Sequence, residues 1–121
     1  MDRTTVIYNP SCSKCRATRS LLEERGEDLE IVQYLVAPPD TEEIRRLLAM
    51  LGGDPAALVR SDDDAFAAAG LGPGDIADAE GVVRVLVAHP ALMQRPVVVR
   101  GDRAVIARPP ERVEELFEAH A

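Results

Sequence analysis

The order of its short apolar segments is the feature that most restricts how this chain of 121 residues can fold. Residues Thr4–Tyr8 are largely β-branched and apolar, which predicts a strand. A turn at Asn9-Pro10-Ser11 leads into a helical pattern that starts at Ser11 or Cys12 and ends at Gly26. A second strand is expected at about Glu30–Tyr34. Two strands joined by a helix require a crossover connection, so this part of the chain predicts a β-α-β unit.

The middle of the chain, from Pro38 to Pro90, predicts helices and no strands. Apolar residues recur there at helical spacing, and proline and glycine separate the segments. Aspartate is a preferred N-cap because its carboxylate accepts a hydrogen bond from the first free backbone N–H groups. The expected helices begin at Asp40 or Thr41, at Asp54, at Asp63 and at Asp78.

Two further strands, at residues 97–99 and 104–106, are joined through Gly101-Asp102 and predict a hairpin. Pro109 and Pro110 then open a last helix with Val113 and Leu116 on its apolar face. The whole order predicts an α/β chain with a thioredoxin-like fold. Its four-stranded mixed sheet carries a helical insertion between the second and third strands. At this length we expect residues 1–121 to form a single domain.

Charge and hydropathy narrow the classes of partner. The formal net charge is −7, with 14 Lys and Arg against 21 Asp and Glu. Such a balance argues against direct nucleic-acid binding and against an anionic membrane surface, because both need a basic face. No apolar stretch approaches the 18 or more residues of a bilayer span, and no signal-peptide pattern opens the chain. We therefore expect a cytoplasmic protein with no membrane partner.

The two cysteines, Cys12 and Cys15, stand three residues apart. In a reducing compartment this spacing indicates redox or metal chemistry before a structural disulfide. A zinc site needs four ligands, and the chain adds only the distant His89 and His120, so we expect neither a metal nor a bound cofactor. His89 is interpreted as structural.

The start of the first helix favours ionisation of Cys12. Backbone N–H groups are unpaired there, the helix dipole is positive, and Lys14 and Arg16 add positive charge. Cys12 is thus the candidate nucleophile, and Cys15, one turn further, is the candidate resolving thiol. The alternative for either residue is a small, buried apolar side chain.

Five short motifs give the chain a resemblance to a known family. They occur in the same order as in that family, from Val6 to about Phe117, and each lies near the end of a predicted strand or helix. Together they resemble the glutaredoxin-coupled arsenate reductase family. The motifs are Ile7-Tyr8-Asn9-Pro10-Ser11-Cys12, Tyr34-Leu35 with Pro38-Pro39, Leu58-Val59-Arg60, His89-Pro90 with Gln94-Arg95-Pro96, and Ala107-Arg108-Pro109.

This resemblance implies an enzyme of arsenic detoxification in which Cys12 attacks arsenate. It implies that Arg60, Arg95 and Arg108 hold the oxyanion, which suits the planar fork of guanidinium groups. Arg95 precedes one strand of the hairpin and Arg108 follows the other, so both emerge from the same end and can converge. By the same resemblance Pro96 is a cis-proline facing the cysteine, and Asn9 is a structural residue near the site.

The chain departs from that family at two positions. Tyr8 stands where many of these reductases have a histidine, and Cys15 where serine is common. Cys15 points to an internal Cys12–Cys15 disulfide that a thioredoxin-type donor reduces, in place of glutathione and glutaredoxin. Two alternatives stay open. One is an Spx-type transcription regulator that uses the pair as a redox switch and binds RNA polymerase, and the other is a general thiol-disulfide oxidoreductase.

Overall fold

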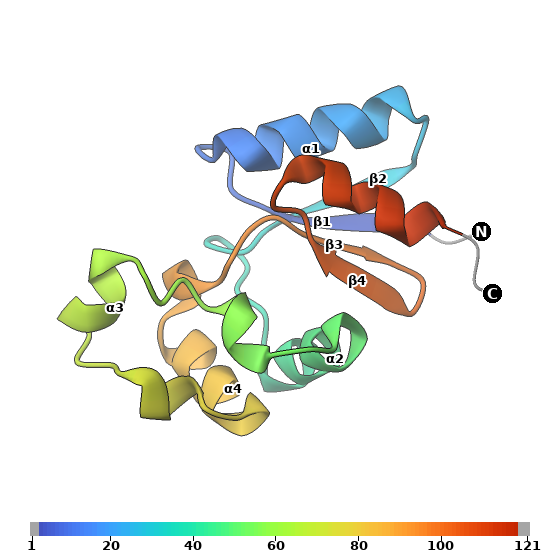
Figure 1. Cartoon of the computed structure of the whole chain (residues 1–121). Helices are drawn as coiled ribbons and strands as arrows, with labels where there is room; N and C mark the ends of the chain where they lie inside the picture. The colour runs from blue at the N-terminus through green and yellow to red at the C-terminus, as the bar shows by residue number, and fades with distance from the viewer. Residues whose placement is uncertain (1–2, 119–121) are drawn as a thin grey trace. The chain divides into compact units, whose positions relative to one another are not determined.

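The computed structural model of the chain describes residues 3–118 (Figure 1). Two compact units are present. The first, which we call the sheet unit, combines the chain up to Ala37 with the chain from Arg95 onward. The second, the helical unit, consists of Pro38–Gln94.

The sheet unit contains four strands in the order β2-β1-β3-β4. They are β1 (Thr4–Tyr8), β2 (Leu29–Gln33), β3 (Val97–Arg100) and β4 (Arg103–Ile106). β1 pairs in parallel with β2 and antiparallel with β3, and β3 pairs antiparallel with β4. The predicted α/β class and the mixed, thioredoxin-like sheet are therefore confirmed.

One face of this sheet carries the core of the unit. Val6 lies opposite Ile31 on β2 and Val98 on β3, and α1 (Ser13–Glu24) and η4 (Pro110–Phe117) lie on the same side of the strands (Figure 1). Alternate strand residues point to one face, so this face becomes continuous and apolar. The buried cluster consists of Val6, Tyr8, Cys15, Leu22, Val98, Val105, Ala107, Val113 and Leu116.

One edge of the sheet gathers segments that are far apart in sequence. β1 and β2 run in parallel, so their carboxyl ends meet there, with Tyr8 opposite Gln33. β3 runs the other way and begins at this edge, with Val97 opposite Ile7. The turn after β1, the residues after β2 and the residues before β3 are consequently neighbours.

The last segment of the sheet unit is helical, as predicted. Residues Pro110–Phe117 form the 3-10 helix η4, and Val113 and Leu116 are buried as expected. The guanidinium of Arg103 on β4 donates hydrogen bonds to three backbone carbonyls at the end of this segment, those of Glu115, Leu116 and Glu118. A side chain thus satisfies acceptors that helix ends leave unpaired. His120 lies outside the described residues.

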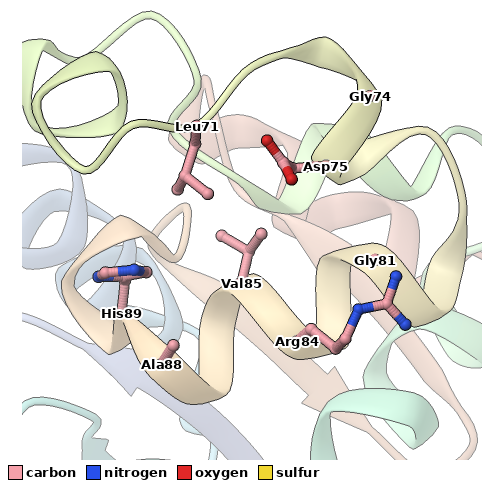
Figure 2. Close-up of a pocket in the computed structure, with 8 residues that line it drawn as sticks. All are labelled: Leu71, Gly74, Asp75, Gly81, Arg84, Val85, Ala88 and His89. Atoms are coloured by element: carbon pink, nitrogen blue, oxygen red, sulfur yellow. The ribbon is translucent and has the colours of Figure 1, made fainter.

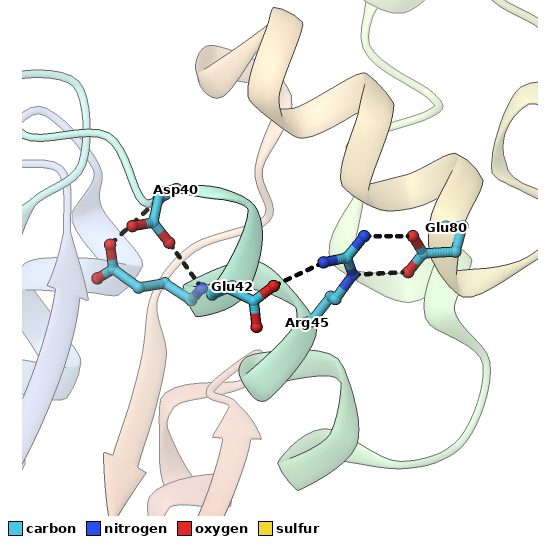
Figure 3. A network of polar contacts seen from close by, with 5 residues as sticks. Asp40, Glu42, Arg45 and Glu80 are labelled. Atoms are coloured by element: carbon cyan, nitrogen blue, oxygen red, sulfur yellow. Dashed lines mark hydrogen bonds and ion pairs between the residues drawn. The ribbon is translucent and has the colours of Figure 1, made fainter.

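The helical unit contains the α-helices α2 (Thr41–Leu51), α3 (Asp64–Ala68) and α4 (Ala79–Ala88) and three 3-10 turns, η1 (Pro55–Leu58), η2 (Pro73–Ile76) and η3 (Pro90–Leu92). The predicted aspartate caps are confirmed, and each carboxylate accepts from a backbone N–H. Asp40 forms a reciprocal capping box with Glu43 (Figure 3). In the same view Arg45 on α2 forms a fork with Glu80 on α4, at 2.7 and 3.0 Å.

Within residues 3–118 the structure contains no helix with the length and apolar character needed to cross a membrane.

Candidate functional site

The turn between β1 and α1 fixes the position of Cys12. The Asn9 side-chain oxygen accepts from the N–H of Ser11 at 2.9 Å, and the Asn9 carbonyl accepts from the N–H of Cys12 at 3.0 Å. An asparagine that bonds the backbone two residues on is a common turn former. Cys12 then takes extended backbone angles as the N-cap of α1. Asn9 is thus a structural residue of this turn.

The sulfur of Cys12 lies among hydrogen-bond donors. Its burial alone would raise its pKa, but donors from the backbone N–H and thiol of Cys15, from the Arg95 side chain and from the N–H of Lys14 outweigh burial. Together they lower the pKa of Cys12 to about 7. The thiol makes no side-chain cap bond to the helix, whereas a thiolate is the stronger acceptor and draws these donors. Cys12 therefore ionises readily near neutral pH.

Cys15 has the opposite character. It is fully buried in the core cluster of the sheet unit. Burial raises the pKa of Cys15 to about 12, the N–H of Asn9 acts against this, and contact with the Cys12 sulfur adds to it. Cys15 is consequently a neutral thiol that donates to Cys12. The structure brings the two sulfurs together as the sequence spacing predicts.

Arg95 comes to the site from the residues before β3. The Arg95 side chain is half-buried and donates to the Cys12 sulfur. Burial would lower the pKa of Arg95, but the contact with Cys12 and the negative character of neighbouring groups raise it, so the guanidinium stays charged. A charged group beside a thiolate favours the ionised sulfur.

Arg108 lies next to Arg95, though in a different way from the one expected. Its guanidinium donates to the backbone carbonyl of Arg95 at 3.0 Å, so it braces the chain that carries Arg95. The predicted convergence of the two arginines at one end of the hairpin is seen in this bond. The Arg108 side chain is half-buried. Whether its other guanidinium N–H groups face the site and bind an anion stays a prediction.

Arg60 belongs to the helical unit, and its approach to Cys12 stays a prediction. Its guanidinium forms an ion pair with Asp63 at 2.8 Å, and both side chains are more than two-thirds buried. Asp63 also caps α3. The aspartate therefore fixes the direction of the Arg60 side chain. Sequence reasoning missed this partner, although the spacing of three residues was a visible signal.

Three further residues of the sheet unit were named in the sequence motifs. Pro96 follows a cis peptide bond, as the resemblance implies, and Arg108-Pro109 is a second cis bond that was not foreseen. Tyr8 is buried in the core cluster, which makes it a packing residue of the sheet unit. Tyr34, known from the sequence only as part of a motif, is fully buried and interacts with Arg95.

The Tyr34 hydroxyl is unusual for a buried polar group. It has no hydrogen-bond partner among residues 3–118. Most buried hydroxyl groups do find a partner, so each exception needs an explanation.

His89 lies in the helical unit, at the end of α4. Its backbone N–H donates to the carbonyl of Val85 at 2.8 Å and so ends the helix, and a structural role of the imidazole stays a prediction. A cavity of about 220 Å³ lies beside it, lined also by Asp75 and Arg84 (Figure 2). The described part of the chain holds no group of three or more His, Cys, Asp and Glu side chains that could bind a metal ion.

We expect the alkylation rate of Cys12 to rise with pH through a midpoint of about 7, because only the thiolate reacts. Mass spectrometry of the native protein at short reaction times measures this rate and counts one adduct per chain. A midpoint near the ordinary cysteine value of about 8.5, or two adducts formed at equal rates, would contradict the assignment of the two sulfurs.

Comparison with known proteins shows the family of the chain. A sequence profile of the ArsC family matches residues 7–116. An arsenate reductase of Neisseria meningitidis serogroup A is 38% identical over 118 residues, which cover 97% of this chain and 100% of that protein. The uncharacterized protein YfgD of Escherichia coli is 39% identical over 112 residues, covering 92% and 93%. The solved structure of an arsenate reductase from Vibrio cholerae has a TM-score of 0.86 and 32% identity, and covers 94% of this chain and 97% of its own. The chain belongs to the ArsC family.

Proposed function

We propose that this protein is an arsenate reductase in which Cys12 is the nucleophile and an external thiol restores the enzyme. The observation that carries the proposal is the position of the Cys12 sulfur, which lies at the start of α1 and accepts from the Arg95 side chain. A reactive thiolate and a guanidinium at one point suit attack on an oxyanion. Relatives over nearly the whole length of the chain are named arsenate reductases.

In the first step the Cys12 thiolate attacks arsenic. A sulfur–arsenic bond forms, an arsenic–oxygen bond breaks, and the departing oxygen takes up protons and leaves as water. The negative charge on the other oxygens opposes this attack, so nearby cations lower the barrier. We assign this role to Arg95 together with Arg60 and Arg108. The ion pair with Asp63 orients the Arg60 side chain.

In the second step a thiol attacks the Cys12 sulfur. A disulfide forms, the electron pair of the sulfur–arsenic bond passes to arsenic, and arsenite leaves. The Cys15 thiol touches the Cys12 sulfur and is the nearest candidate for this attack. Its high pKa means that it must lose its proton as the new bond forms, and the departing arsenic oxygens can accept that proton.

The partner in the last step is a thiol donor that reduces the Cys12–Cys15 disulfide. A thioredoxin-type dithiol suits an internal disulfide, whereas glutathione with glutaredoxin suits a mixed disulfide on Cys12. The protein would need no bound cofactor, because the electrons come from thiols.

Arg95→Ala is expected to lower kcat/KM for arsenate by about 10²–10³ through the loss of one charged donor. The assay is arsenate-dependent oxidation of an added thiol. Arg46→Ala is the matched control, since Arg46 is an exposed arginine on α2, and it should leave the rate unchanged. Arsenate reduction by Arg95→Ala at the unaltered rate would reject the proposed site.

The contact between Cys12 and Cys15 also favours a second function. A disulfide between them would remove the thiolate that Arg95 binds, so the pair could act as the redox switch of an Spx-type regulator. Co-purification with RNA polymerase that changes on oxidation, without arsenate turnover, would support this function. Reduction of insulin without arsenate would instead indicate a general thiol-disulfide oxidoreductase.

A further inference from the structure

The two cysteines differ in what can reach them from solvent. Cys12 is half-buried at the start of α1, whereas Cys15 is fully buried in the core cluster. Cys12 is therefore the sulfur that a small oxidant in solution meets first. Because the two side chains are in hydrogen-bond contact, an oxidised Cys12 has a second thiol beside it from the start.

Arg95 donates to this sulfur, and Tyr34 directly follows β2 at the same edge of the sheet. The Arg95 side chain donates to Cys12 and interacts electrostatically with Tyr34. The Tyr34 side chain is fully buried, and its hydroxyl has no partner among residues 3–118. An oxygen atom held at Arg95 would give this hydroxyl an acceptor, which accounts for a buried donor in this place.

We propose that the protein also reduces small hydroperoxides, with Cys12 as the attacking sulfur, Arg95 and Tyr34 as donors to the peroxide oxygens, and Cys15 as the resolving thiol. This activity goes beyond arsenate reduction and requires no arsenic compound. It uses groups of the sheet unit alone.

The first step transfers one oxygen atom. The Cys12 thiolate attacks the terminal oxygen of the hydroperoxide, a sulfur–oxygen bond forms and the oxygen–oxygen bond breaks. The electron pair of that bond stays on the departing oxygen, which takes up a proton and leaves as an alcohol, or as water when the substrate is hydrogen peroxide. The peroxide is reduced and Cys12 is oxidised to a sulfenic acid. Arg95 and Tyr34 stabilise the charge that develops on the departing oxygen.

The second step closes the disulfide. The Cys15 sulfur attacks the Cys12 sulfur, the sulfur–sulfur bond forms, and the hydroxyl of the sulfenic acid leaves with the Cys15 proton as water. One hydroperoxide and two thiols thus give one alcohol, one water and one disulfide. A dithiol reductant then returns the pair to thiols by exchange.

The experiment treats the fully reduced protein with one equivalent of hydrogen peroxide, in the presence of a metal chelator and without arsenate. We expect a loss of two hydrogens per chain and a Cys12–Cys15 disulfide by peptide mapping. The second-order rate per thiolate should exceed that of the same chain unfolded in guanidinium by about 10²-fold.

Three variants assign the roles. Arg95→Lys and Tyr34→Phe are each expected to slow the reaction by about tenfold or more. Arg95→Lys replaces the planar guanidinium by a single ammonium group, and Tyr34→Phe removes the hydroxyl, so each weakens hydrogen bonding to the departing oxygen. Tyr34→Phe removes a hydroxyl that has no partner, so it should not weaken the fold, and thermal unfolding checks this. In Cys15→Ser we expect a sulfenic acid on Cys12 that a dimedone probe traps.

Several results would overturn the proposal. They are a rate per thiolate equal to that of the unfolded chain, over-oxidation of Cys12 in the wild type with no disulfide, and wild-type rates in both donor variants. Arsenate turnover measured on the same preparation separates this outcome from failure of the reductase function, because active enzyme that fails with peroxide rejects only the peroxide reaction.

Discussion

Replacing Cys12 with serine is expected to abolish arsenate-dependent thiol oxidation, with a fall in kcat of about 10⁴-fold or more, as for other nucleophiles that are removed. A serine hydroxyl at this position is not ionised near neutral pH, so the donors that hold the thiolate have no anion to stabilise. The same donors lower the pKa of Cys12 to about 7 in the wild-type protein. The measurement is thiol consumption with and without arsenate. Substantial turnover by Cys12→Ser would place the chemistry elsewhere in the chain.

Cys15→Ser is the informative counterpart of that variant. It leaves the nucleophile in place and removes the neighbouring thiol, so arsenate should still react with Cys12. Without added thiol, mass spectrometry after one turnover should find a Cys12–Cys15 disulfide in the wild type and an arsenic adduct on Cys12 in the variant. An adduct with no disulfide in the wild type would show that Cys15 does not resolve the intermediate.

Gly81→Ala is expected to produce a large loss of stability in the helical unit. A Cβ atom at Gly81 would overlap with the backbone carbonyl oxygen of Asp75 and lie 3.1 Å from the Asp78 carboxylate. Overpacking of this kind costs about 1–3 kcal/mol, and it exceeds the gain of about 1 kcal/mol that alanine brings inside a helix. The relief would require a shift of η2 against α4, because the Asp75 oxygen belongs to the main chain. Urea unfolding monitored by circular dichroism measures the difference in the free energy of unfolding between the wild type and Gly81→Ala.

The matched control for this prediction is Gly74→Ala. An added Cβ at Gly74 meets no atom within 4 Å, and the backbone there is not left-handed. The change should therefore alter the free energy of unfolding by no more than about 0.5 kcal/mol. Equal midpoints for Gly81→Ala and Gly74→Ala would mean that α4 and η2 approach less closely than described.

Local signals in the sequence were sufficient for most of the fold. The aspartate caps at Asp40 and Asp78 act within their own helix turns, and the two-residue turn at Gly101-Asp102 joins β3 and β4 directly. One contact of the last helix could not be predicted in the same way. Arg103 reaches from β4 to the carbonyls of Glu115 and Leu116, and no local pattern reports such a contact.

Some contacts among the candidate site residues could be predicted from the sequence, and others could not. The spacing of Cys12 and Cys15 indicated a reactive and a resolving thiol, and the positions of Arg95 and Arg108 around the hairpin indicated that they meet. No sequence pattern indicated that the Arg108 guanidinium binds the Arg95 carbonyl. The sequence also carried no signal that the Tyr34 hydroxyl is buried without a partner, since burial is decided by the packing of the entire chain.

The unequal environments of the two cysteines also link folding to proton binding. The pKa of Cys12 is lowered to about 7. The ionisation of Cys12 therefore contributes its full stabilisation of the fold above the unfolded pKa of about 8.5. This contribution is lost as the pH falls through 7. The pKa of Cys15 is raised to about 12. The neutral Cys15 thiol therefore contributes its full stabilisation of the fold below about pH 8.5, and this contribution is lost as the pH rises toward 12. Only mildly alkaline solution preserves both contributions, and the pair therefore stabilises the reduced fold most near the pH at which an unfolded cysteine is half ionised.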